Sequence, residues 1–224
     1  MSTVNDIEAL APVRAGKPAK FPAAPYLSAA GYFDAYASEL ASAASSVEPA
    51  ALDSAAAILL QAYVRGAGVF ACGNGGSAAI ANHLQCDHLK GVRTATDLRP
   101  RVVSLTTSAE LLTAIANDIG YEDVFRYQLQ SQARPGDVLV VVSSSGRSRN
   151  IVTALRWARE HDLRTIALTG FEGGEARAVA EVAIHVDSTN YGIIEDLHQT
   201  IMHALAQYIR QSRMTAAMVE SSVF

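Results

Sequence analysis

This chain of 224 residues is half hydrophobic and 18% charged, a composition typical of a folded globular protein rather than a disordered one. A net charge of −4 without any basic run argues against nucleic acid as a partner, and no apolar stretch reaches the roughly 18 residues that cross a bilayer. Only two cysteines, and no apolar leader at the N-terminus, predict a cytoplasmic protein without a disulfide framework.

The first quarter of the chain is predicted to hold an arm and two helices. Residues 1–26 contain four prolines and little periodicity, so we expect an N-terminal arm there. Residues 27–47 are alanine-rich with aromatic side chains, and residues 49–65 carry apolar side chains at helical spacing. The sequence shows no clear domain boundary after these two helices, so residues 27–224 are expected to form a single domain.

Short apolar runs then alternate with helical patterns down the rest of the chain. Strands are predicted at residues 69–72, 101–105, 138–143, 165–168 and 182–186. Helices should begin near residues 77, 108, 121, 148 and 174, and a last helix should span about residues 192–213. This alternation predicts an α/β fold, with a parallel sheet covered by helices on both faces. Ligands of such sheets bind at the carboxyl ends of the strands.

The first strand of this series ends in a glycine-rich loop, residues 73–77 (GNGGS). Glycine permits positive φ and close approach of a ligand to the backbone, and the following helix would present unpaired N–H groups to an anion. The alternative is a plain turn in which Ser77 caps the helix. The spacing fits neither the dinucleotide fingerprint nor a P-loop, so no nucleotide cofactor is expected.

The third strand ends in a second loop that is rich in hydroxyl groups. Ser143, Ser144, Ser145 and Ser148 lie within six residues around Gly146. Buried hydroxyls need hydrogen-bond partners, and a phosphate at a helix N-terminus would supply them. The alternative is that one or two of these serines cap the helix.

Two histidines and two carboxylates are candidates for acid–base or metal chemistry. His83 and Asp87 are four residues apart on one predicted helix, and so share a face. Glu195 and His203 are eight residues apart on the last helix, about 80° apart around its axis. Where the two faces meet, the four side chains would suit a divalent metal such as zinc, or a general acid and base. The alternative is two surface helices with ordinary charges.

Three segments together resemble the sugar isomerase (SIS) domain and, more narrowly, the phosphoheptose isomerases. They are residues 70–77 (FACGNGGS), 143–148 (SSSGRS) and 168–174 (LTGFEGG), which occur in the family's order and at its spacing. The resemblance covers about residues 30–210. It implies a three-layer αβα domain with a five-stranded parallel sheet, flavodoxin-like in type, in a homotetramer with sites between subunits.

The resemblance also implies a function and a set of site residues. Phosphoheptose isomerases convert sedoheptulose 7-phosphate to D-glycero-D-manno-heptose 7-phosphate, so the partner is a phosphosugar rather than a nucleic acid or a membrane. Asp87 would be the base and His203 the acid, with Glu195 as an alternative base. The same resemblance places His83, Asp87, Glu195 and His203 at the family's zinc positions. The implied substrate-binding residues are Asn74, Gly75, Gly76, Ser77, Asn117, Asp118, Ser143, Ser144, Ser145 and Ser148.

The sequence departs from the family's pattern at two of these positions. Asp87 stands where the family usually has glutamate, and Glu195 stands where it usually has glutamine. The first change shortens the expected base by one methylene, and the second adds a negative charge. Two alternatives therefore stay open beside the heptose isomerase: an isomerase of another phosphosugar, and a non-catalytic SIS module that only binds one. No redox cofactor is expected, because isomerisation through an enediol needs none.

Overall fold

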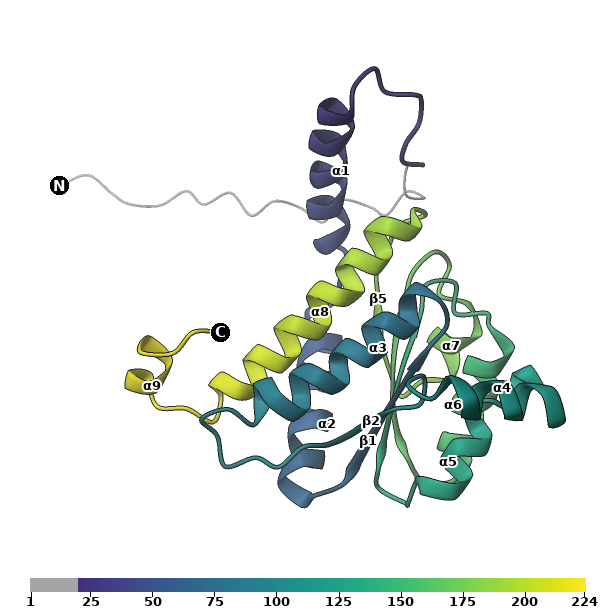
Figure 1. Cartoon of the computed structure of the whole chain (residues 1–224). Helices are drawn as coiled ribbons and strands as arrows, with labels where there is room; N and C mark the ends of the chain where they lie inside the picture. Colours follow the sequence, from purple (N-terminus) through teal and green to yellow (C-terminus); the bar gives the residue numbers. More distant parts are fainter. Residues whose placement is uncertain (1–19) are drawn as a thin grey trace.

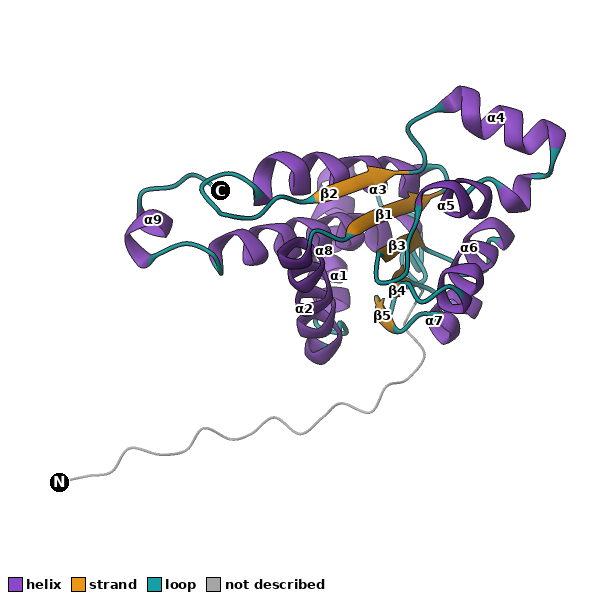
Figure 2. Ribbon diagram, turned by 90° about the horizontal axis from the view of Figure 1, so that it is seen from below, coloured by secondary structure: helices purple, strands orange, loops and turns teal. Residues whose placement is uncertain are grey.

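The computed structural model describes residues 20–224, so residues 1–19 of the predicted arm lie outside the described part. A parallel five-stranded sheet runs through the middle of that part, in the order β2-β1-β3-β4-β5 (Figure 2). The strands are β1 (Gly68–Gly73), β2 (Arg101–Ser104), β3 (Val138–Ser143), β4 (Arg164–Thr169) and β5 (Val182–His185). All five predicted strands are confirmed, to within two residues at each end.

The central strands are buried on both faces, which explains why they read as uninterrupted apolar runs. Every residue of β1 and of β3 is buried, as expected for parallel strands covered on both sides. β1 pairs with β3, with Gly73 beside Val142. The order of strands reverses between these two, so both predicted loops leave the sheet at its switch point, where open α/β sheets bind ligands.

Helices cover the sheet on both faces, so the predicted three-layer arrangement is confirmed (Figures 1 and 2). One apolar core joins the sheet to α2, α3 and α8, and a second joins it to α4, α5, α6 and α7. The helices are α1 (Ala29–Ala44), α2 (Pro49–Arg65), α3 (Gly76–Cys86), α4 (Ala109–Asp118), α5 (Arg126–Gln132), α6 (Arg149–Glu160), α7 (Gly174–Val179), α8 (Tyr191–Gln211) and α9 (Ala216–Glu220).

One stretch of helix departs from α geometry. After Cys86 the chain continues as a π-helix, η1 (Asp87–Val92). A shorter 3₁₀ turn, η2 (Tyr121–Asp123), stands where a helix was predicted to begin, and α5 follows it. π-helical turns are rare and often occur at functional sites, and this one begins at a candidate site residue.

The helix α1 projects from the body near the N-terminal end of α8 (Figure 1). Within the chain it buries only Ala43, while Phe33 is 69% exposed. Tyr36 ties it to α8 by donating a hydrogen bond of 2.7 Å to Asp196. No described helix is by itself long and apolar enough to span a membrane, although α1 and α2, bent by 75°, pass that test as a pair.

Candidate active site

The two loops at the switch point enclose a small polar cavity. The cavity, here called the serine cavity, has a volume of about 150 Å³. Its lining comes from the first loop, the second loop and the start of α8: Asn74, Ser77, Val142, Ser143, Ser144, Ser145, Ser148, Tyr191 and Glu195. Two loops more than 60 residues apart in the sequence therefore supply one site, because β1 and β3 are adjacent in the sheet.

The geometry of the first loop excludes the capping alternative for Ser77. The residue that caps α3 is Gly75, with φ +54°, and Ser77 lies inside the first turn, almost fully buried. Gly73 must be glycine for another reason, since a Cβ there would lie only 2.5 Å from the carbonyl oxygen of Ser77. The loop is thus folded tightly enough to bring the Ser77 side chain into the cavity.

The serines of the second loop differ in how their hydroxyl groups are used. Ser148 caps α6 by position, but its side chain makes no capping hydrogen bond within residues 20–224. Ser143 and Ser145 accept hydrogen bonds from the backbone N–H groups of Gly146 and Arg147, at 3.2 and 3.3 Å. Ser144 is buried, and its Oγ has no hydrogen-bond partner in the described part of the chain. A buried hydroxyl without a partner is costly, which favours a polar ligand over simple capping.

The second loop is held in place by direct backbone contact with the loop before α7. Gly146 has φ +62°, and a Cβ added to it would overlap the carbonyl oxygen of Gly173. A Cβ on Gly174, which has φ +54°, would lie 2.5 Å from the carbonyl of Gly146. The N–H of Ala176 also donates to the Gly146 carbonyl at 2.9 Å. The serine loop therefore rests on a rigid backbone support.

A second polar cluster lies where the end of α3 and the start of η1 meet α8. His83, Asp87 and His203 place one nitrogen or oxygen atom each within 4.8 Å of the others. His83 Nε2 is 3.3 Å from Asp87 Oδ1, His203 Nε2 is 3.4 Å from Asp87 Oδ2, and the two Nε2 atoms are 3.4 Å apart. Asp87 and His203 also line a neighbouring cavity of about 390 Å³. Three of the four predicted residues are thus brought together.

The expected four-residue cluster must be corrected, because Glu195 lies elsewhere. Its carboxylate lies against Gly76, where a Cβ would be 2.6 Å from Glu195 Oε2, and it lines the serine cavity. Glu195 and His203 share a side of α8, but eight residues separate them by about 12 Å along the axis. The N-terminus of α3 is a favourable place for a carboxylate, since the helix dipole is positive there.

Two other histidines are core residues rather than candidates for acid–base chemistry. His88 and His198 are completely buried, and burial lowers the pKa of each to about 4. The Nδ1 atom of His88 is hydrogen-bonded to the hydroxyl of Tyr63. Both rings are therefore neutral at ordinary pH, and they occupy space in the core near α8.

The structure does not bring Asn117 and Asp118 to the serine cavity. Both are exposed in the last turn of α4, where Asn117 Nδ2 donates to Asp118 Oδ1 at 2.7 Å. Their helix projects from the rest of the fold (Figure 2) and buries only Ile115. Contact of these two residues with a sugar stays a prediction.

Three polar residues near these groups were not predicted. Tyr191, at the start of α8, lines the serine cavity, and Gln199 Nε2 lies 3.0 Å from His203 Nε2. Asn150, in the first turn of α6, is paired with Asn74. Gln199 lies between Glu195 and His203 in the sequence, and helical spacing could have found it. Asn150 could not be found that way, because its partner is 76 residues away.

Comparison with known proteins gives a consistent result. The model of the SIS domain matches residues 31–170. A phosphoheptose isomerase of Alteromonas mediterranea is 35% identical over 177 residues, which cover 78% of this chain and 89% of that protein. One from Akkermansia muciniphila is 44% identical over 140 residues, covering 62% and 74%. The structure of phosphoheptose isomerase GmhA from Neisseria gonorrhoeae superposes with a TM-score of 0.74 at 34% identity, covering 81% of this chain and 96% of that one.

Proposed function

The chain belongs to the SIS-domain family and, within it, to the phosphoheptose isomerases, and we propose that it converts sedoheptulose 7-phosphate to D-glycero-D-manno-heptose 7-phosphate. This is an aldose–ketose isomerisation, which moves a proton between two adjacent carbons. The observation that carries the proposal is the pairing of a hydroxyl-lined cavity with a separate His–Asp–His cluster along the same two helices.

The serine cavity is assigned to the phosphate end of the substrate. Its buried hydroxyl on Ser144 lacks a partner among residues 20–224, and the hydroxyl of Ser148 is left uncommitted at the N-terminus of α6. Hydroxyl donors and a helix N-terminus both favour a phosphate. At about 150 Å³ the cavity is small, so the rest of the sugar would extend out of it, toward the His–Asp–His cluster.

The His–Asp–His cluster is assigned to the reacting carbons. The 12 Å or so between Glu195 and His203 along α8 is a length that an extended seven-carbon chain with a terminal phosphate can span. Asp87 would remove the proton next to the carbonyl group, and His203 would donate a proton to the oxygen. Glu195 lies at the phosphate end in this arrangement, so we assign it to sugar hydroxyls rather than to the role of base.

The same cluster suits a divalent metal. With zinc–ligand bonds of about 2.0–2.1 Å, neighbouring ligand atoms in a tetrahedron lie about 3.3 Å apart. The three closest contacts in the cluster are 3.3, 3.4 and 3.4 Å, with Asp87 meeting His83 through Oδ1 and His203 through Oδ2, and one ligand atom from each residue lies within 4.8 Å of the others. We propose that His83, Asp87 and His203 can hold zinc; because an Nε2 atom that binds the ion cannot also donate a proton, the ion would then take the place of His203 in stabilising the sugar oxygen. A bound zinc ion would act as a Lewis acid toward the sugar oxygen.

Nuclear magnetic resonance of the purified protein with sedoheptulose 7-phosphate tests both assignments. We expect the aldose signals to grow with time, to weaken after treatment with a chelator, and to recover when zinc is added back. If a chelator does not change the rate of turnover, the proposal that a metal takes part in the reaction is rejected. Binding of the sugar phosphate without turnover would support the non-catalytic alternative, and turnover of a different phosphosugar alone would support the other isomerase.

We also propose that the protein is a homotetramer with its sites near subunit contacts. The support is the exposure, within one chain, of two large apolar residues: Phe33 on α1 and Leu27 just before that helix. Light scattering should give a mass four times that of the 23.7 kDa chain. Replacing Phe33 with glutamate should shift that mass downward, because a charge cannot be buried in an apolar contact without a large penalty. A fully active monomer would contradict the proposal.

A cytoplasmic location is retained as part of this proposal. Both Cys72 and Cys86 are free thiols, as expected in a reducing compartment.

A further inference from the structure

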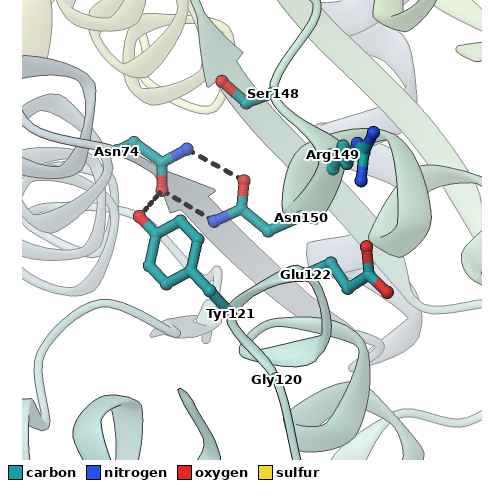
Figure 3. A pocket seen from close by; sticks show the side chains of 7 residues that line it. All are labelled: Asn74, Gly120, Tyr121, Glu122, Ser148, Arg149 and Asn150. Atoms are coloured by element: carbon teal, nitrogen blue, oxygen red, sulfur yellow. Dashed lines mark hydrogen bonds between the residues drawn. The ribbon is translucent and has the colours of Figure 1, made fainter. Parts of the chain in front are cut away.

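Two asparagines from different layers of the fold are joined by a reciprocal pair of hydrogen bonds (Figure 3). Asn74 Nδ2 donates to Asn150 Oδ1 at 2.9 Å, and Asn150 Nδ2 donates to Asn74 Oδ1 at 2.8 Å. The hydroxyl of Tyr121 donates to the same Asn74 Oδ1 at 3.0 Å. Asn150 is 1% exposed, so its side chain has no access to solvent as an alternative partner.

A backbone group determines which way this pair is oriented. By itself, a reciprocal amide pair looks the same when both side chains are flipped. Here the N–H of Ile151 also donates to Asn150 Oδ1, at 3.0 Å. A backbone N–H can only donate, so an oxygen must occupy that position. The oxygen of Asn150 then requires the nitrogen of Asn74 opposite it, which fixes the orientation of both side chains.

The orientation limits what Asn74 can offer to a ligand. Its Oδ1 accepts two hydrogen bonds, from Asn150 and Tyr121, and so both lone pairs are used. Its Nδ2 has two hydrogens, and one is used by Asn150. A single N–H is left. Asn74 also lines the serine cavity, so it meets a substrate there as a hydrogen-bond donor only.

We propose that Asn150 and Tyr121 are positioning residues that hold the Asn74 amide so that its free N–H points to an acceptor oxygen of the bound phosphosugar. Neither residue needs to touch the substrate. Both lie with Asn74 on a neighbouring cavity of about 500 Å³, from which Tyr121 reaches Asn74 at the edge of the loop (Figure 3). This inference rests on the proposed function, because it concerns how the same site binds its substrate.

A double-mutant cycle separates positioning from a general structural role. Asn150→Ala should raise KM for sedoheptulose 7-phosphate about 3- to 10-fold with little change in kcat, which corresponds to one ordinary hydrogen bond. Tyr121→Phe should raise KM by a smaller factor. Asn74→Ala should raise KM as well. In the Asn74→Ala background neither substitution should raise KM further, because the group that they hold is gone.

Controls keep the experiment decisive. Gln128→Ala removes another buried amide, one that bonds the carbonyls of Leu105 and Val124, and it should lower thermal stability without changing KM. If Asn150→Ala does not fold, Asn150→Asp replaces it in the cycle. An aspartate oxygen can still accept the hydrogen bonds from Asn74 Nδ2 and from the N–H of Ile151. The direct effect of its added charge on the substrate is present in both backgrounds, so that part cancels in the coupling. The proposal is overturned when the KM changes are equal in both backgrounds, or absent, in a protein whose unmodified form turns over the substrate. No turnover and no binding by the unmodified form would instead reject the proposed function.

Discussion

Replacing Asp87 with asparagine should lower kcat/KM for sedoheptulose 7-phosphate by about 10²- to 10⁴-fold, the range contributed by a general acid or base. The amide has nearly the same shape as the carboxylate but neither removes a proton nor binds zinc as well. Asp87 lies 3.3 Å from His83 and 3.4 Å from His203, so the substitution removes the one negative charge from this cluster. Most of the loss should appear in kcat. Single-turnover measurements by nuclear magnetic resonance would show it.

Asp87→Glu is the matched variant for this experiment. The extra methylene would push the carboxylate toward two imidazoles that already lie in contact with it, and a misplacement of about 1 Å costs on the order of 100-fold in rate. We therefore expect activity between that of the unmodified enzyme and Asp87→Asn. Asp87→Asn retaining at least a third of the activity would show that another group, with Glu195 the first choice, is the base.

The second large effect is expected at the phosphate end. Replacing Ser144 and Ser148 together with alanine should weaken binding of the substrate about 10²- to 10⁴-fold, because each hydrogen bond to a charged group contributes about 1.5–3 kcal/mol. These two hydroxyls are chosen because neither is used by a side-chain or capping bond within residues 20–224. Their loss should thus cost little stability. Calorimetric titration with the sugar phosphate measures the affinity.

A serine outside the site provides the control for this double variant. Ser131 lies on α5, where its hydroxyl meets only the carbonyl of Tyr127 at 3.5 Å among the described contacts. Ser131→Ala should leave the affinity unchanged. If the folded double variant binds the sugar phosphate with unchanged affinity, the phosphate does not bind in the serine cavity.

The sequence was a good guide to the elements whose burial is uniform. β1 and β3 are buried along their whole length, so each appears in the sequence as an uninterrupted apolar run and was predicted as a strand. The π-helix after Cys86 had no such signal, because its residues keep the apolar spacing of an ordinary helix end while the backbone bonding pattern changes. The short helix α9 was missed too, since none of its five residues is buried.

The residues of each loop of the candidate site could be predicted from the sequence, but the way in which the site residues are placed relative to one another could not. Each serine was found from its own loop, because a strand followed by hydroxyls and glycine is a local pattern. Glu195 was misplaced because the prediction used only its angle to His203 around the helix axis and left out the rise of about 12 Å that eight residues give. The pairing of Asn74 with Asn150 depends on two strands that become neighbours only after folding.

Gly146 and Gly174 impose a joint constraint on how this enzyme can change. A side chain on Gly146 would overlap the backbone of Gly173, and one on Gly174 would overlap the backbone of Gly146, so neither position can acquire a side chain while the two loops stay in contact. Selection for another phosphosugar, in nature or in the laboratory, is thereby directed away from the loop backbone. It should act instead on Tyr191 and Glu195, which border the same cavity from α8 and whose side chains can be exchanged without moving a loop.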